Sequence, residues 1–406
     1  MESATFDIVI AGGGLSGLAL AAELARPEFS ALRVLILEQR EHYVRDRTWS
    51  YWKASGRAPH RYSHLERKNW NRWRVQMDFG GDRTLSSMVT SESKAESYCS
   101  LDGDEFYQAA QSAISQSKHV VLRLGTAVRH IVDGDHPHVE TMDGCVIHAT
   151  WIFDARPPAS EKAGALVQQF VGIEITTDID IFDPTTVELM QFQPTTHGVH
   201  FFYVLPYSPR NALIETTWIS PDSFKPDFSA ELARYIAESL GASTYIVTYE
   251  EKGVLNLSMY PNVSPSNKAS QVVRLGRAAG TLRASTGYAF LETLDHIEKI
   301  SASLKNQLGR DALKKWTPIL FERRALDAWM DAVFLNVLAH DWYNSPRYFM
   351  QLFGRLDAES MVAFLSGRAN WRQRLSVFCA LPIMPFARQG LSTLLARPSS
   401  LSRARH

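Results

Sequence analysis

Apolar and polar positions alternate with different periods in successive parts of the chain. Near the start, residues 7–11 form an apolar run, residues 14–24 carry small residues at helical spacing, and residues 32–37 form a second apolar run. These patterns predict a strand, a helix and a second strand. Because the three segments occupy only about 30 residues, we expect a βαβ unit built on parallel strands.

The pattern changes further along the chain. Between residues 165 and 260, apolar and polar positions alternate over short runs separated by Pro, Asn and Gly, which predicts an antiparallel sheet. Further predicted elements are helices at 104–117, 288–308, 310–340 and 359–380, an extended segment at 120–129, and two strands within 144–158 closed by a turn at Pro157 and Pro158.

These elements predict an α/β fold: a Rossmann-type dinucleotide-binding domain, an inserted antiparallel-sheet substrate domain and a C-terminal helical region. The expected nucleotide-binding domain is discontinuous, with residues 1–165 and 265–300. The substrate domain would occupy 166–264, and the helical region 301–406.

Composition narrows the class of protein. The 406 residues are 45% apolar and 21% charged, which is typical of a folded globular chain, and the formal net charge is zero. That balance argues against a dedicated binder of nucleic acid. Three cysteines without a CxxC pair favour a reducing cytosol over a disulfide framework. We expect no secretory signal and no run of about 18 apolar residues that could span a membrane.

The first glycines predict a dinucleotide site. Gly12, Gly14 and Gly17 follow the first strand and open the helix, where glycines allow a tight turn, a close approach to a pyrophosphate and close helix–strand packing. The helix N-terminus would face the phosphates. Glu38 ends the second strand 21 residues after Gly17, where a carboxylate can accept hydrogen bonds from a ribose.

A second glycine segment indicates which dinucleotide is bound. Residues 274–290 contain Gly276, Gly280 and Gly287 and lead into a helix after the predicted substrate domain. A nucleotide half that is interrupted and then resumes with a second glycine contact favours FAD over NAD.

Several segments together resemble the bacterial lycopene β-cyclase family, and they run in the family's order over nearly the whole chain. They are DRTWSYW (46–52), FDAR (153–156), QQFVGIEI (168–175), YVLPYSPRNALIETTW (203–218), GRAAGTLRASTGYAF (276–290), FLSG (364–367) and LPIMPF (381–386). The resemblance implies a membrane-associated, FAD-containing isomerase of carotenoid biosynthesis. It would close a linear isoprenoid end into a ring without net redox change, with the flavin reduced and NAD(P)H as a candidate reductant.

The resemblance also implies site residues. Glu215 matches the family's strand carboxylate and is the first candidate for the acid–base residue, and Glu251 resembles a second family acid. Thr286 would lie near the flavin together with Gly276, Gly280 and Gly287. Candidates for aromatic rings facing a carbocation in the substrate pocket are Trp49, Phe202 and Tyr288.

Departures from the family pattern leave the substrate open. The family's Met-Asp-Phe-Arg reads here as residues 190–193 with Gln191 and Gln193, so amides replace an acid and a base. Arg47 stands where the family has His, and Trp52 where His is common. A prenylated aromatic or meroterpenoid is therefore an alternative substrate to a carotene. A redox flavoprotein, either a monooxygenase or a halogenase, is the rival class of enzyme.

Other patterns have two interpretations. Residues 66–77 interleave Arg, Lys and Trp, but an amphipathic strand explains them better than a nucleic-acid surface. Histidine pairs at 136/138 and 197/200 lack accompanying ligands, so no metal is expected. The apolar stretches 325–338 and 375–386 predict either core helices or a surface dipping into the inner face of a membrane. In the second case Arg388, Arg397, Arg403 and Arg405 would suit anionic headgroups.

Overall fold

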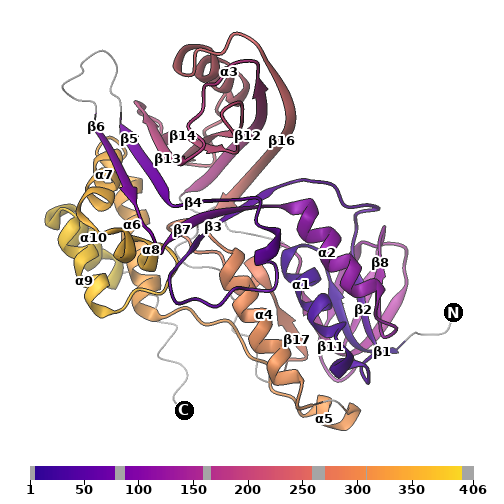
Figure 1. The fold of residues 1–406 in the computed structure, drawn as a ribbon. Helices are drawn as coiled ribbons and strands as arrows, with labels where there is room; N and C mark the ends of the chain where they lie inside the picture. The colour runs from indigo at the N-terminus through magenta and orange to yellow at the C-terminus, as the bar shows by residue number, and fades with distance from the viewer. Residues whose placement is uncertain (1–4, 78–86, 159–165, 258–269, 308, 396–406) are drawn as a thin grey trace.

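The computed structural model describes residues 5–77, 87–158, 166–257, 270–307 and 309–395 (Figure 1). Residues 265–269, at the predicted return to the nucleotide-binding domain, lie outside the described residues, as does the basic tail with Arg397, Arg403 and Arg405.

The predicted βαβ unit forms the centre of a seven-stranded sheet in which β1 pairs in parallel with β2 and with β11. The remaining parallel strands are β8 and β17, and β10 and β9 extend the sheet with antiparallel pairing. The strands are β1 (Thr5–Ala11), β2 (Val34–Leu37), β8 (Val120–Arg123), β9 (Val128–Val132), β10 (His138–Thr141), β11 (Val146–Asp154) and β17 (Val272–Arg274). The helices of this half are α1 (Leu15–Leu24), α2 (Gly103–Ser115) and α4 (Phe290–Leu304), and all three contribute to one apolar core.

A second seven-stranded sheet has the order β16-β12-β15-β14-β13-β5-β6, with only β13 and β5 paired in parallel. Its strands are β5 (Arg72–Met77), β6 (Ser87–Glu92), β12 (Val167–Thr177), β13 (Thr186–Gln193), β14 (Val199–Pro206), β15 (Asn211–Ser220) and β16 (Tyr245–Asn256). Two of its strands thus precede the predicted 166–264 segment. Helix α3 (Phe228–Arg234) covers one face of this sheet, which we call the α3 face.

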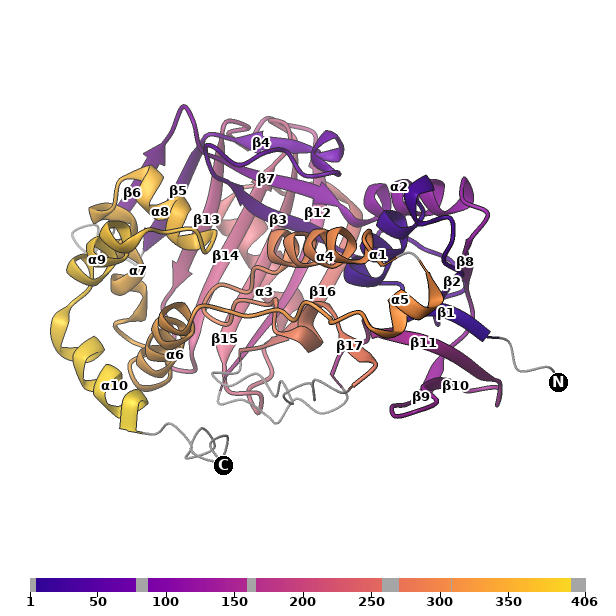
Figure 2. The ribbon, with the colours of Figure 1, turned by 90° about the horizontal axis from the view of Figure 1, so that it is seen from below.

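A third, three-stranded sheet lies between the two large ones in the view of Figure 1 and overlaps the second sheet in the view of Figure 2. It consists of β3 (Thr48–Lys53), β4 (Lys68–Trp70) and β7 (Ser97–Asp102). The basic and aromatic stretch at 66–77 holds two strands, β4 and β5, in different sheets, rather than the single strand expected: Trp70 and Trp73 are buried, whereas Arg72 is exposed.

The C-terminal part is helical. Helix α7 packs beside β5 and β6, whereas α5 lies against the nucleotide-binding half (Figure 2). Its helices are α5 (Arg310–Lys314), α6 (Ala325–His340), α7 (Ser345–Arg355), α8 (Ala358–Leu365), α9 (Trp371–Ala380) and α10 (Ile383–Leu395). Among the described residues, no helix has the length and hydropathy needed to cross a bilayer.

Three predicted elements are corrected. The helix expected over 310–340 is interrupted between α5 and α6, where Pro318 disfavours helical backbone before it and has no N–H to donate. The helix expected over 359–380 is divided into α8 and α9 by Gly367, whose φ is +71°. Residues 144–158 hold one long strand, β11, rather than two.

Candidate active site

The cavity that concerns function lies between the second sheet and the C-terminal helices and has a volume of about 650 Å³. Four groups of elements line it. The second sheet contributes Gln168, Phe170, Leu189, Met190, Phe201, Tyr203, Leu213, Glu215, Ile219, Glu251 and Leu255. The third sheet adds Thr48, Ser50, Trp52 and Tyr98, and residues 285–288 form a further wall.

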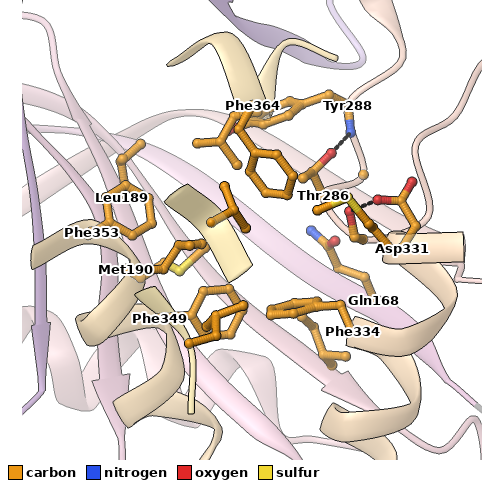
Figure 3. Close-up of a pocket in the computed structure, with 18 of the residues that line it drawn as sticks. Gln168, Leu189, Met190, Thr286, Tyr288, Asp331, Phe334, Phe349, Phe353 and Phe364 are labelled. Atoms are coloured by element: carbon orange, nitrogen blue, oxygen red, sulfur yellow. Dashed lines mark hydrogen bonds between the residues drawn. The ribbon is translucent and has the colours of Figure 1, made fainter. Parts of the chain in front are cut away.

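Helices α6 to α10 supply most of the apolar lining. Figure 3 shows Phe334, Phe349, Phe353 and Phe364 around one space, close to Leu189 and Met190. The four phenylalanines belong to α6, α7 and α8, and these helices are far along the sequence from the strands that they face. The cavity is therefore mostly apolar, with few polar groups, as is typical of sites for hydrophobic molecules.

The two predicted acids meet in this cavity. Gly172 of β12 lies opposite Glu215 of β15 on one side and opposite Glu251 of β16 on the other. Directly opposed residues point to the same face of a sheet, so both carboxylates face the cavity. A Cβ at Gly172 would lie 3.2 Å from Cγ of Glu251, which shows that the Glu251 side chain passes over the glycine.

The environment of each carboxyl group keeps it protonated at higher pH than usual. The pKa of Glu215 is raised to about 8, mainly because burial disfavours the charged form and next because the charge of Glu251 is close, while a hydrogen bond from Thr217 acts in the opposite direction. Burial also raises the pKa of Glu251 to about 7, against a 2.7 Å hydrogen bond donated by the Tyr249 hydroxyl. Near neutral pH the pair can hold one proton.

Three tyrosines stand beside this pair. Tyr203 lies opposite Glu215 in the neighbouring strand, and its hydroxyl donates to that of Tyr98 at 3.0 Å. The Tyr288 hydroxyl donates to the same oxygen at 3.3 Å. Burial raises the pKa of all three phenols, so they remain neutral. Tyr288 is thus placed in the cavity lining, as expected.

The other two predicted aromatic residues lie elsewhere, which corrects the expectation for them. Trp49 packs against Phe106 and Phe290 in the core of the nucleotide-binding half. Phe202 stacks on Tyr235 at a centroid distance of 3.9 Å on the α3 face. Successive residues of a strand point to opposite faces, so the neighbours of Phe202 in β14 line the cavity and Phe202 does not.

The departures at Gln191 and Gln193 also lie away from the cavity. In the register of β13 with β14 they pair with Phe202 and His200, and the Gln191 side chain accepts a hydrogen bond from Tyr235. These amides therefore do not contact a molecule in the cavity. Trp52, in contrast, lines it, so this substitution replaces a titratable ring by an apolar one.

His200 belongs to the second histidine pair. His200 is buried on the α3 face, where it stacks on Trp218 and bonds to Thr216. Across the described residues, no group of three or more His, Cys, Asp and Glu side chains is arranged as a metal site.

The nucleotide-binding turn has the geometry that a dinucleotide requires. Gly12 has φ +101°, and a Cβ at Gly17 would lie 1.9 Å from the Gly12 carbonyl oxygen. Glycine at both positions therefore lets the turn pack closely against the helix. A Cβ at Gly14 would meet no atom within 4 Å, which leaves open space at the N-terminus of α1. This is the place where a pyrophosphate would be accepted.

Glu38 lies next to this turn. Its carboxylate accepts a 2.6 Å hydrogen bond from the backbone N–H of Gly13 and pairs with Arg40 at 3.0 Å. Burial acts to raise the pKa of Glu38, but the hydrogen bonds from Arg40 and Gly13 outweigh it and leave the pKa below its usual value. The group is therefore ionised, and its two oxygens accept four hydrogen bonds from Gly13 and Arg40, so a ribose would have to replace one of those from Arg40.

The second glycine segment meets the first in space. Gly276 has φ +58°, and a Cβ there would lie 2.7 Å from the Ser16 hydroxyl of α1. Gly280 follows with φ +88°, and Thr286 and Gly287 line the cavity. The second glycine segment thus begins beside α1 and reaches the cavity wall at Thr286 and Gly287.

Sequence reasoning missed a buried ion pair that supports this wall. The Arg283 guanidinium contacts Asp331 of α6 at 3.1 Å, and Asp331 also accepts a 2.7 Å hydrogen bond from Ser285 (Figure 3). Arg283 further donates to the carbonyl of Phe364 in α8. The pair ties residues 283–288 to two C-terminal helices. Only the unusual position of Asp331 in an apolar helix could have indicated it.

Comparison with solved structures agrees with the fold. A geranylgeranyl bacteriochlorophyll reductase-like protein from Thermoplasma acidophilum has a TM-score of 0.57 at 11% identity, with 99% of each chain covered. The halogenase PltM, solved with phloroglucinol and FAD, has a TM-score of 0.54 at 14% identity, covering 98% of this chain and 93% of the other. These likenesses confirm the predicted fold class.

Sequence comparison is more specific. A lycopene beta-cyclase from Paracoccus sp. (strain N81106 / MBIC 01143) is 26% identical over 404 residues, which covers 94% of this chain and 95% of that protein. The lycopene cyclase protein family matches residues 7–390. The chain therefore belongs to the lycopene cyclase protein family.

Proposed function

We propose that this chain is an FAD-dependent isomerase that closes the end of a linear isoprenoid, such as a lycopene end group, into a ring by adding and later removing a proton. The observation that carries the proposal is the pair Glu215 and Glu251, held on either side of Gly172 in an apolar cavity. Such a pair can donate a proton to a substrate that offers no polar group to bind.

Glu215 is the proton donor in this proposal. A carboxyl group with a pKa of about 8 is largely protonated at neutral pH, so it can act as a general acid there. Its proton would form a C–H bond at the terminal double bond of the isoprenoid and leave a tertiary carbocation on the adjacent carbon.

The cavity wall would then direct the carbocation to ring closure. Water would trap such a cation, so the phenylalanines of α6, α7 and α8 act by excluding it. The ring faces of Trp52, Tyr98 and Tyr203 can stabilise positive charge. The next double bond of the chain attacks, one C–C bond forms, and the charge moves to a ring carbon.

Loss of one proton completes the reaction. Glu251, with a pKa of about 7, or the carboxylate left on Glu215 can accept the proton from the ring. One C–H bond has formed, one C–C bond has formed and one C–H bond has broken, so the product is an isomer and no electrons are consumed.

The residues of the nucleotide-binding half fit FAD. Gly12, Gly14 and Gly17 with the N-terminus of α1 would hold the pyrophosphate, and Glu38 the ribose. The Gly276–Gly280 segment, with Thr286 and Gly287, would hold the flavin end against the cavity. Reduced flavin would supply negative charge beside the cavity, and a nicotinamide cofactor such as NAD(P)H would serve only to reduce it.

The test is an anaerobic assay with chemically reduced FAD and lycopene in vesicles, with a prenylated aromatic in parallel. We expect a product of unchanged mass and shorter chromophore, formed without stoichiometric consumption of reductant. A mass gain of one oxygen atom that requires O₂ would instead show a monooxygenase. Turnover of the prenylated aromatic alone would assign the second candidate substrate.

The variant Glu215→Gln separates chemistry from folding. It keeps the size and shape of the side chain but removes the acidic proton, so we expect bound FAD at the wild-type level and at least a hundredfold loss of cyclisation, within the usual range for a general acid. Absorbance of bound flavin and product analysis measure the two effects. Cyclisation at the wild-type rate would refute the assignment.

A further inference from the structure

Helices α9 and α10 present an apolar face outward. On α9, Trp371, Leu375 and Phe378 are 69%, 54% and 41% exposed and follow one another at the i, i+4, i+7 spacing of a single helix face. On α10, Ile383 and Leu391 are 78% and 62% exposed and lie two turns apart. We call these five residues together with Met384, which is 81% exposed, the α9–α10 face.

This arrangement is the reverse of an ordinary surface helix, whose apolar side packs inward. Isolated exposed apolar residues need no explanation, but a contiguous apolar surface marks an interaction site. The inward side of α9 packs against the rest of the protein, because Val377 is buried there and Arg374 pairs with Asp327 of α6 at 2.8 Å. On the outward side the Phe378 ring lies 6.1 Å from the Trp329 ring of α6 between centroids, but Trp371, Leu375 and Phe378 all remain exposed.

The α9–α10 face is continuous with the cavity. Phe378, Ile383 and Leu391 are exposed and also belong to the lining, as do their neighbours Leu381 and Phe386. Glu251, at 7% exposed, lies at the closed part of the same lining. An apolar molecule could therefore pass from this face to the carboxylates along apolar surface.

The charge around the face favours an anionic partner. From Ser360 to the end of the chain the sequence holds no Asp or Glu, although the whole chain has equal numbers of acidic and basic residues. Arg372 and Arg388 are exposed on the two helices, and Arg372 lies over the Trp371 ring at 5.3 Å. Apolar side chains with Trp and Arg beside them are the composition of a surface that inserts into the headgroup region of a bilayer.

We infer that the α9–α10 face docks on an anionic lipid bilayer and that the cavity opens into the bilayer through it, so that an apolar substrate enters without crossing water. The reason for such an entrance rests on the proposed function, but the docking itself is measured without any substrate. A second copy of the chain seated on this face would be the competing occupant.

The experiment is flotation of the full-length, FAD-loaded protein with vesicles of phosphatidylcholine, with and without phosphatidylglycerol. The test variant carries Trp371→Ser, Leu375→Ser and Met384→Ser, none of which lines the cavity. The matched control carries Met142→Ser, Ile179→Ser and Ile246→Ser, which replace equally exposed apolar residues elsewhere. We expect wild type and control to float with anionic vesicles, and the test variant to partition at least about tenfold less.

Fluorescence gives a second readout. Trp371 is the only exposed tryptophan, since the others are buried or partly buried and all lie within the described ranges. Lipids brominated on their acyl chains should therefore quench it on binding, and Trp371→Phe should bind while losing that quenching. Equal flotation of test variant and wild type would overturn the inference. So would a dimer in sedimentation that the test variant dissociates, with no vesicle binding by the wild type.

The two proposals fail in different ways. Vesicle binding through this face without cyclisation of any substrate would refute the proposed function and leave the docking surface standing. Cyclisation of lycopene from detergent micelles by a protein that never floats with vesicles would refute the docking surface alone. If both hold, the test variant should match wild type in micelles and lose activity only on vesicles.

Discussion

Gly172 carries no functional group, yet it sets the relation between the two acids. A side chain at this position would lie against Cγ and Oε1 of Glu251, at 3.2 Å and 3.5 Å from its Cβ. The glycine therefore gives Glu251 the space to lie over β12 toward Glu215. Glycine inside a strand often marks such a close approach.

The coupling of the acids gives a pH prediction. Because the charge of Glu251 helps to raise the pKa of Glu215, Glu251→Gln should lower that pKa. In the wild type we expect activity to decline as pH rises through about 8, where Glu215 loses its proton. In Glu251→Gln the decline should move to lower pH, measured as kcat/KM against pH. Glu250→Gln is the matched control, because Glu250 is exposed on the same strand and should leave the profile unchanged.

Single residues were predictable where a family motif marks them and not where only strand alternation does. Glu215, in an apolar run, and Glu251, in the charged run Glu-Glu-Lys, were both named from the resemblance. Phe202 was placed wrongly because β14 reads VHFFYVLP, which is apolar on both faces, so alternation gives no sign of which ring faces the cavity. The register with β15 settles this, and it is a long-range property.

At the scale of elements, local segments were the most predictable. The turn at Gly12–Gly17 and its helix depend on contacts within about 30 residues, so the glycine spacing was sufficient. The C-terminal helices were merged in the prediction, because their ends at Pro318 and Gly367 are single residues inside long apolar stretches. Helix α7 was not predicted at all.

The nucleotide-binding turn offers a test that separates FAD binding from folding. Gly14 has an ordinary φ of −76° and open space at its Cβ, so Gly14→Ala should fold normally. The added methyl group would occupy the approach to the pyrophosphate, so we expect FAD affinity to fall by about tenfold or more. Quenching of free flavin fluorescence measures the affinity, and thermal unfolding of the FAD-free protein checks the fold. Unchanged affinity would show that the phosphates lie elsewhere.

On the scale of the whole molecule, the site is assembled from two parts that are remote in sequence: acids on the second sheet and a water-excluding wall from α6 to α10. The acids were recognisable in the sequence from the family resemblance, but the wall was not, because apolar helices that line a cavity have the same pattern as helices that fill a core. The ion pair of Arg283 with Asp331 then joins this wall to residues 283–288.

A variant of the wall should change the product rather than only the rate. Phe334→Ala removes a ring that borders the cavity, so water should reach the carbocation and yield a tertiary alcohol, with a mass gain of one water. Phe202→Ala is the control, since it removes a buried ring on the α3 face at a similar cost, about 3–5 kcal/mol. The control should give no alcohol. Mass analysis of products distinguishes the two variants, and an alcohol from both would contradict the assigned wall.

The carboxylate pair, finally, stands at one place in a cavity that opens at another. For a long substrate with two reactive ends, each end would have to enter in turn, and the molecule would have to withdraw and reverse between the two events. The product with one ring accumulates if it diffuses away into the surrounding medium faster than it enters the cavity a second time. The ratio of one-ringed to two-ringed product would therefore depend on how often molecules enter and leave the cavity, and not on the proton transfer by Glu215 and Glu251.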